Sequence, residues 1–342
     1  MRYSAGWLTF FLFTITVAFA LGIAIIFLTS DFPLESVKWF FFGPVSNLYF
    51  LGNMLSNSIP LIMTAIAAVV SFSSGLFNLG LEGQVYFGAF FGTLTALFLP
   101  DIPSFFAKMI VLLAAFFAGM MLSGVSVFLK IKLNIDELIS SFLLSQATVH
   151  IIDYFLNGPM RDPSAGLAAS KYIDLSFSKI LPPSQLHSGI FISAFFCFAL
   201  YMLMNYSWFG LETRIAKNRR FAEYIGVDVK GVWVLTMLIS GGIAGLSGMV
   251  DVLGVHSRVV KGFSAGYGFN GIAVALIARN NPILVIPAAI FFSYLEAGSQ
   301  VASFMSDITP EMSRIIQGAI FYLVTAEAIL DFIAKRKVKK IW

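Results

Sequence analysis

Charge and cysteine are both scarce in this sequence. Only 12% of its 342 residues are charged, whereas ordinary soluble domains carry about 25%. In their place, 58% of the residues are hydrophobic, and 37 residues are phenylalanine. A soluble chain of this length could not bury so much apolar surface in one core. A soluble enzyme, a disordered protein and a nucleic-acid-binding protein are therefore excluded, which leaves a polytopic membrane protein.

Missing motifs exclude further chemistries. The single cysteine, Cys197, rules out an intrachain disulfide, and the three histidines do not have metal-ligand spacing. No G-x-x-x-x-G-K-[ST] motif occurs, so the chain does not bind ATP by a P-loop. The segment Gly266–Gly271 matches G-x-G-x-x-G, but no strand pattern precedes it and Phe291 stands where a dinucleotide site needs an acid. We expect no catalytic residue, metal or cofactor in this chain.

Long apolar runs predict an all-α membrane protein with about ten transmembrane segments in one domain, residues 1–342. A full span takes about 20 residues, so the short run Phe269–Ala278 is expected to be a half-helix or a re-entrant segment surrounded by protein. The first run extends to Leu28, longer than the core of a signal peptide, and is interpreted as a retained span. The expected spans are Trp7–Leu28, Leu51–Val70, Glu82–Leu99, Phe105–Leu129, Glu137–Leu156, Gly189–Asn205, Val232–Leu253, Phe269–Ala278, Ile283–Ser299 and Met312–Ile333.

The distribution of lysine and arginine predicts the orientation of these spans. With the N-terminus inside and ten crossings, 14 of the 22 basic residues fall on the inner side. The basic tail 334–342 and the basic loop 207–231 then both lie inside, and the long polar loop 157–188 lies outside. An odd number of crossings would place one of the two basic clusters outside. We therefore count the short segment as a crossing and expect both termini in the cytoplasm.

Two glycine-rich segments resemble each other, and the crossing count places them on opposite sides of the membrane. They are Phe72–Gly80 and Phe263–Gly271. Oppositely oriented copies of a polar break are typical of inverted-repeat transporters, whose substrate site lies near the midplane. Chance similarity is the alternative, because glycine, serine and phenylalanine are all common in this chain.

Small residues recur four apart as three pairs in two of the expected spans, at Gly88/Gly92, Gly241/Gly245 and Ala244/Gly248. This spacing places them on one helix face and favours close packing between helices. We expect that packing to lie within the chain, with a dimer interface as the alternative.

Polar side chains inside spans are costly and are often functional. For Glu82, capping of the start of its own helix is an equal alternative, because the helix dipole favours an acid there. Gln146 shares one helix face with His150 and Asp153, and a hydrogen-bonded face toward the bundle interior is the alternative for that group. The candidates for a translocation pathway are Asn78, Glu82, Gln84, Gln146, Asn270 and Asn280.

The loop 207–231 carries charges of both signs and apolar residues at roughly helical spacing, which predicts a short amphipathic helix. A helix that lies on anionic lipid is expected to be mainly basic. The acids Glu212, Glu223 and Asp228 therefore favour a protein partner over a lipid surface.

Five segments, in order along the chain, resemble the permease subunits of ATP-binding-cassette (ABC) importers. The resemblance is to the branched-chain amino acid/simple sugar/nucleoside permease superfamily, and within it to the nucleoside and general simple-sugar branch. The segments are Gly75–Gln84, Asn134–Ser140, Gly158–Pro163, Gly210–Gly226 and Gly271–Pro282.

This resemblance implies a multi-pass permease of the bacterial inner membrane that imports nucleosides, with riboflavin or a simple sugar such as ribose as alternatives. It implies two cytoplasmic ATPase subunits that hold ATP and magnesium, a second permease subunit and an extracytoplasmic solute-binding protein that faces the loop 157–188. The segment Ala216–Arg220 lacks the family's glycine and proline, which indicates a specialised ATPase partner. The residues implied to contact the ATPase are Arg214, Asn218, Ala222 and Gly226.

An ion-coupled secondary transporter is the rival from another class. It would need acids within the membrane that exchange protons or sodium ions. The available acids are scattered along the chain, and they are Glu82, Asp153, Glu296 and Glu327.

Overall fold

The computed structural model describes residues 22–309 without a gap, and residues 16, 19, 20, 311, 314, 315, 318, 319 and 322 beyond them. The chain divides into two compact units. The larger unit is Ser56–Ala289, and the smaller combines Met1–Leu55 with Ile290–Trp342. Each unit is described by itself.

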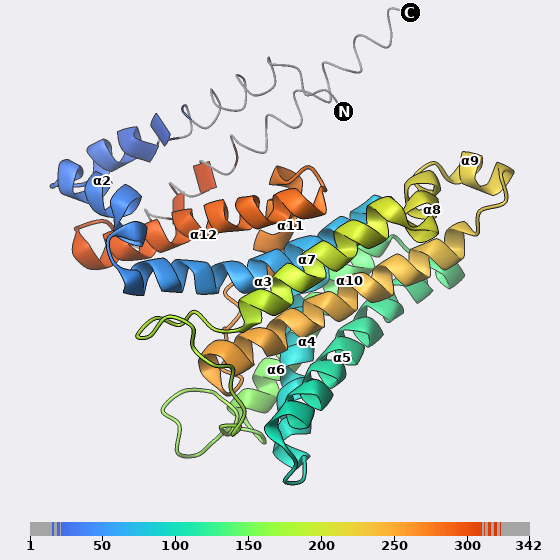
Figure 1. Ribbon diagram of the computed structural model, residues 1–342, viewed down its shortest axis with the longest axis horizontal. Helices are drawn as coiled ribbons and strands as arrows, with labels where there is room; N and C mark the ends of the chain where they lie inside the picture. Colours follow the sequence, from blue (N-terminus) through green and yellow to red (C-terminus); the bar gives the residue numbers. More distant parts are fainter. Residues whose placement is uncertain are drawn as a thin grey trace, which may run out of the picture. The chain divides into compact units, whose positions relative to one another are not determined.

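All named elements of the described residues are helices, which confirms the predicted all-α class (Figure 1). Only two isolated β-bridges accompany them in that part of the chain. The helices are α2 (Pro33–Phe42), η1 (Gly43–Val45), α3 (Leu48–Ser73), α4 (Leu81–Phe98), α5 (Ser104–Leu133), α6 (Glu137–Asn157), α7 (Gly189–Tyr206), α8 (Trp208–Ala216), α9 (Arg219–Tyr224), α10 (Val229–Asp251), η2 (Val252–His256), α11 (Tyr267–Ile277) and α12 (Pro282–Met305).

Six helices in the described residues are long and apolar enough to cross a membrane. They are α3, α5, α6, α7, α10 with η2, and α12. The 18-residue α4 is not among them, since polar Glu82 and Gln84 occupy its first turn, and α11 is a shorter apolar helix as predicted. The expected count of about ten crossings is thus not confirmed. The span Met312–Ile333, most of Trp7–Leu28 and the tail 334–342 lie outside the described residues.

Glycines join α10 to α4 and α5 at the centre of the larger unit. A Cβ atom on Gly119 of α5 would lie 2.0 Å from the carbonyl oxygen of Gly241 on α10, and one on Gly88 of α4 would lie 2.2 Å from that of Gly245. No side chain fits at such distances, so the backbones themselves are in contact. The predicted small-residue packing within the chain is confirmed at these positions.

Short polar side chains cap the starts of α6, α8, α9 and α10, as helix-capping preferences predict. The Asp136 carboxylate accepts a hydrogen bond from the Leu138 N–H (2.9 Å) at the start of α6. Asp228 caps α10 in the same way, through the Gly231 N–H. Asn134, in the left-handed conformation, ends α5. These caps fix the ends of α5, α6 and α10 at the surface that carries α8 and α9.

The loop 157–188 contains no helix and is held along the chain that follows α10. Ala169 forms a β-bridge with Val260, and the Phe177 N–H donates to the Leu253 carbonyl oxygen (2.8 Å). This loop and the α8–α9 segment lie at opposite ends of the larger unit (Figure 1). The placement agrees with the prediction that the two loops face opposite sides of the membrane.

The smaller unit has its own apolar core, formed by the buried residues Ile26, Phe40, Leu295, Ala302 and Ile308. Helix α2, which was not predicted, contributes Phe40 to this core. The Asp307 carboxylate accepts hydrogen bonds from the Ser30 hydroxyl (2.6 Å) and the Asp31 N–H (2.6 Å), and these bonds lower the pKa of Asp307 to about 2.

Candidate functional site

The site is built around the break between α3 and α4, residues 74–80. Gly75 has a φ of +86°, which side-chain-bearing residues rarely adopt, and the turn ends α3 there. The break carries Asn78, and the first turn of α4 carries Glu82 and Gln84. Three of the six predicted pathway residues therefore lie close together.

Asn78 and Gln84 are bound to each other and are almost fully buried. The Asn78 Nδ2 donates to Gln84 Oε1 (2.9 Å) and to the Ser240 hydroxyl on α10 (2.9 Å). In return, Asn78 Oδ1 accepts from Gln84 Nε2 (3.0 Å) and from the Gly80 N–H (3.0 Å). Since a buried amide needs its partners, this network fixes the break against α10.

The Glu82 carboxylate caps the start of α11, not the start of its own helix. One carboxylate oxygen accepts from the Gly268 N–H (2.7 Å) and the other accepts from the Ser264 hydroxyl. A Cβ atom on Gly268 would lie 2.2 Å from the Glu82 nitrogen, so only glycine allows this approach. Glu82, two residues after the glycine-rich segment Phe72–Gly80, thus binds the similar segment Phe263–Gly271. The inverted repeat itself stays a prediction.

A stripe of three α6 side chains accepts hydrogen bonds from the break. Glu137, Ser141 and Ser145 are spaced four residues apart and share one helix face. They accept from the N–H groups of Phe77 (3.4 Å), Leu79 (3.1 Å) and Gly83 (2.7 Å), respectively. This stripe was not predicted, although three polar residues spaced four apart at the start of an expected span were a visible signal.

Gln146, Asn270 and Asn280 are half-buried, and within the described residues none hydrogen-bonds to Asn78 or Gln84. Gln146 follows Phe142 by one helical turn on α6, and Asn270 follows Phe269 on α11. The rings of Phe142 and Phe269 lie 6.3 Å apart between centroids, so these parts of α6 and α11 are neighbours. Asn280 has a φ of +57° and forms the polar turn that was predicted before Pro282.

The loop 207–231 contains two short helices where one amphipathic helix was expected. The chain bends at Lys217 and Asn218 because the Asn218 side chain accepts from the Phe221 N–H (3.3 Å) and starts α9. Among the implied ATPase contacts, Arg214, Asn218 and Gly226 are exposed. Ala222 is instead fully buried in a small core with Ala216, Val229 and Val232.

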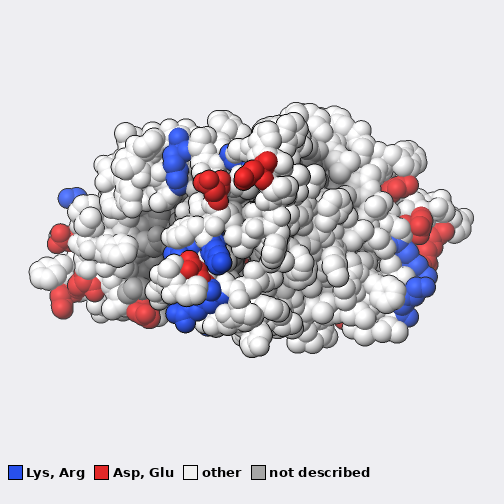
Figure 2. Space-filling view, turned by 90° about the horizontal axis from the view of Figure 1, so that it is seen from below, with Lys and Arg blue, Asp and Glu red and all other residues white. Residues whose placement is uncertain are grey.

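Large apolar side chains of α8 and α9 are exposed. Tyr224 is 88% exposed, Trp208 is 73% exposed and Phe221 is 52% exposed. Figure 2 shows that charged side chains occur in separate patches on a surface that is otherwise uncharged. Apolar groups beside charged ones form a surface that a protein partner can cover.

At the opposite end of the larger unit, two basic side chains of the loop 157–188 contact η2. Lys179 donates to the Gly254 carbonyl oxygen (2.8 Å). His187 is fully buried, and its Nδ1 accepts from the Gly189 N–H (3.2 Å). Burial, together with the nearby Lys179 charge, lowers the pKa of His187 to about 4, so its imidazole is neutral at neutral pH.

A family model described as "Branched-chain amino acid transport system / permease component" matches residues 50–325. A glucose ABC transporter permease protein from Haloferax volcanii is 28% identical and covers 94% of this chain and 89% of that protein. A probable riboflavin import permease protein from Treponema pallidum is 31% identical (91% and 84% covered). A guanosine ABC transporter permease protein from Bacillus subtilis is 28% identical (95% and 96% covered). No solved structure matches the chain.

The chain belongs to the branched-chain amino acid transport system permease component family. It is a multi-pass membrane permease of the ABC importer type, as the resemblance in its sequence implied. The names of the relatives cover a sugar, a vitamin and a nucleoside, so family membership leaves the substrate open.

Proposed function

We propose that this permease carries nucleosides across the bacterial inner membrane by alternating access. The observation that supports a nucleoside is the half-exposed surface between α6 and α11. There the partly exposed rings of Phe142 and Phe269 lie 6.3 Å apart, Gln146 follows Phe142 by one helical turn, and Asn270 follows Phe269 in the sequence. Aromatic rings stack on nucleobases, and asparagine or glutamine amides hydrogen-bond to base edges. The Bacillus subtilis relative, whose name specifies guanosine, aligns over almost its whole length.

The other pathway candidates have a positioning role in this proposal. Asn78, Gln84 and Glu82 already have partners within the chain, so they hold the break and α11 in place around the substrate surface. Asn280 lies in the turn after α11 and sets the position of that helix end.

The energy for transport comes from partner subunits in this proposal. Two cytoplasmic ATPases hold ATP and magnesium and dock on the exposed side chains of α8 and α9, with Arg214, Asn218 and Gly226 at the contact. Ala222 supports that surface from beneath. A second permease subunit completes the pathway, and a solute-binding protein docks on the loop 157–188. Both termini then face the cytoplasm.

Riboflavin and simple sugars are the alternative substrates, in line with the Treponema pallidum and Haloferax volcanii relatives. A planar riboflavin ring would use the same aromatic surface, whereas a sugar offers no aromatic plane to stack. An ion-coupled transporter is less consistent with Glu82, because both of its carboxylate oxygens accept hydrogen bonds.

The test is uptake by the complete importer in proteoliposomes, with radiolabelled guanosine, riboflavin, glucose and ribose. We expect guanosine uptake that requires ATP and survives a protonophore. The paired variants Gln146→Ala and Phe269→Ala should raise the half-saturating guanosine concentration, and Phe105→Ala, an exposed phenylalanine at the start of α5, is the control. ATP-driven uptake of riboflavin or a sugar without guanosine uptake would refute the nucleoside assignment. Uptake abolished by the protonophore would refute ATP coupling.

A further inference from the structure

Four consecutive residues of the α3–α4 break, Gly75 to Asn78, each contact a different part of the larger unit. A Cβ atom on Gly75 would lie 3.5 Å from the Lys217 Cα, at the bend between α8 and α9. Leu76 is buried against α5 and α10, the Phe77 N–H binds Glu137 of α6, and Asn78 binds Gln84 and Ser240. The break is thus the place where the α8–α9 segment, three long helices and the buried amide pair converge.

Packing links the α8–α9 segment to the break a second time, through Trp233. The core beneath α8 and α9 contains Ala216 and Ala222, and Trp233 packs against it. The same indole packs against the buried cluster of Leu76, Val127 and Met237. Packed interiors have low compressibility and transmit strain. A displacement of α8 and α9 is therefore passed to Leu76 through the Trp233 indole.

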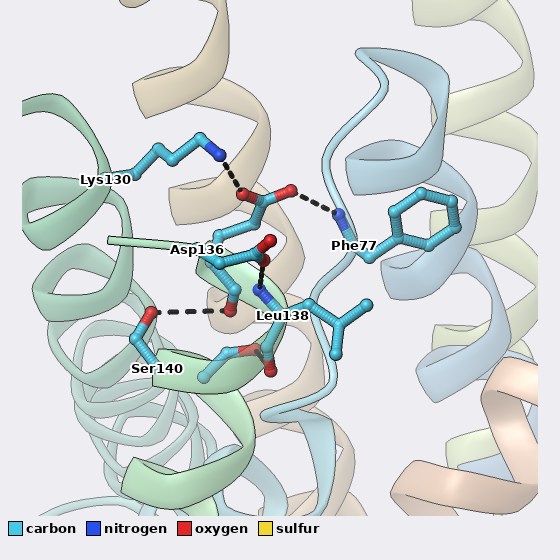
Figure 3. Close-up of polar contacts among 7 residues, drawn as sticks. Phe77, Lys130, Asp136, Leu138 and Ser140 are labelled. Carbon is cyan, nitrogen blue, oxygen red and sulfur yellow. Dashed lines mark hydrogen bonds and ion pairs between the residues drawn. The ribbon is translucent and has the colours of Figure 1, made fainter. Parts of the chain in front are cut away.

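Glu137 is a charged group that holds the break, and both of its carboxylate oxygens have a partner. Oε1 accepts from the Phe77 N–H (3.4 Å), and Oε2 lies 2.7 Å from the Lys130 Nζ (Figure 3). Lys130 comes from the last turn of α5, whereas Phe77 comes from the break. Glu137 is only 6% exposed, and a buried carboxylate without a partner is costly. Lys130 therefore fixes Glu137 in the position that binds Phe77.

We propose that the α3–α4 break transmits movement of the α8–α9 segment to the buried Asn78–Gln84 pair, and that Glu137, paired with Lys130, is the positioning residue that sets the register of the break. The proposal rests on the proposed function, since it assumes that the ATPases act on α8 and α9.

The hydrogen bonds to α6 explain why the α3–α4 break can occupy only discrete positions. Phe77 and Leu79 lie in the break and Gly83 lies in the first turn of α4, where N–H groups have no partner within the helix. All three N–H groups bind side chains of α6. A buried N–H must have an acceptor, so the break can move only between arrangements that satisfy these donors. Glu137, Ser141 and Ser145 define one such arrangement.

The experiment uses the complete reconstituted importer with two measurements. The first is the number of ATP molecules hydrolysed per solute imported, and the second is the amide exchange rate of residues 74–83. Glu137→Ala removes both contacts, whereas E137Q keeps an oxygen acceptor for the Phe77 N–H without the charge. Lys132→Met is the matched control, since Lys132 is exposed two residues beyond Lys130.

We expect E137A to raise the ATP consumed per solute by about fivefold or more and to speed exchange at residues 74–83 by about tenfold. E137Q should restore most of both values, and K132M should match the unmodified protein. Unchanged exchange and coupling in E137A would overturn the proposal. Faster exchange with unchanged coupling would limit Glu137 to a structural role and refute transmission, and equal effects of E137Q and E137A would refute the role of the Phe77 bond.

The experiment also distinguishes failed assembly of E137A from failed import by the unmodified complex. If E137A does not assemble with its partners, Lys130→Met carries the same expectations, because it leaves the Glu137 carboxylate in place but unpaired. If the unmodified complex does not import with ATP, the proposed function fails, while the exchange measurement still tests whether Glu137 positions the break.

Discussion

The carboxylate of Glu82, in the first turn of α4, accepts a hydrogen bond from the backbone N–H of Gly268, in the first turn of α11. The two residues are 186 positions apart. The acid thus meets the positive end of a short apolar helix. Helix α11 depends on a side chain from another helix for its start.

Replacement of Glu82 by alanine should destabilise the protein through α11. It leaves the Gly268 N–H and the Ser264 hydroxyl without their acceptor, at a cost of about 1–3 kcal/mol. Glu82→Gln keeps one carbonyl oxygen and should lose less. Cys197, the single cysteine, is buried, so a thiol-reactive fluorophore reports unfolding as the purified protein is heated. Equal melting temperatures for the two variants would contradict a capping role.

The Asn78–Gln84 pair should behave non-additively. Asn78→Leu or Gln84→Leu alone leaves the remaining buried amide unsatisfied, by about 1–3 kcal/mol. The double variant removes both amides, so its loss should be clearly smaller than the sum of the single losses. Melting temperatures of the four proteins form the cycle. Simple additivity would show that the two side chains do not depend on each other.

Any side chain at position 119 should disrupt the contact between α5 and α10. A valine there would place its Cβ 2.0 Å from the Gly241 carbonyl oxygen and force the helices apart. Overpacking of this kind costs about 1–3 kcal/mol. Gly124→Ala, on the same helix, is the control, because its Cβ would meet only the end of the Leu238 side chain at 3.2 Å. The yield and melting temperature of both variants test the contact.

Charge reversal at Arg214 should uncouple ATP hydrolysis from import without loss of fold. The side chain is exposed on α8 and forms no ion pair within the described residues. Lys38→Glu, at an exposed position on α2, is the control for added negative charge. Both are measured in the complete importer as ATP hydrolysed per solute. An unchanged ratio for Arg214→Glu would refute the proposed ATPase contact at this position.

A lower pH should destabilise the fold of the loop 157–188, because the buried His187 becomes protonated. The folded pKa of His187 is about 4, whereas an ordinary histidine has 6.5. The unfolded chain therefore binds the proton first, and stability falls as the pH drops from 6.5 toward 4, by about 1.4 kcal/mol per unit. His187→Gln, which cannot take up a proton, should show a shallower fall in melting temperature over this range. Parallel curves would contradict the assignment.

The helices of the larger unit were predictable because their apolar runs are long and uninterrupted. Each expected span from Leu51–Val70 to Ile283–Ser299 has a helix within a few residues of its predicted ends. Helix α2 was missed because its ten residues are too few for a span, and the bend at Asn218 because Asn218 caps α9 from inside the predicted helix.

The polar contacts were not predictable from spacing along the chain. Asn78, Glu82 and Gln84 were singled out as polar residues at a break between spans, but their partners Ser240 and Gly268 lie on helices far away in the sequence. Glu137 appeared in the sequence as an ordinary helix start. Its pairing with Lys130 and Phe77 depends on how α5, α6 and the break pack, which hydrophobic periodicity does not specify.

Helix α10 runs from the end of the larger unit that carries α8 and α9 to the end that carries the loop 157–188. It starts at the Asp228 cap beside α9, extends about 35 Å at 1.5 Å per residue, and continues into η2, whose carbonyl oxygens bind Phe177 and Lys179. A shift of this helix along its axis moves both ends together. Under the proposed function, an ATPase docked at one end and a solute-binding protein docked at the other are therefore linked through one continuous helix.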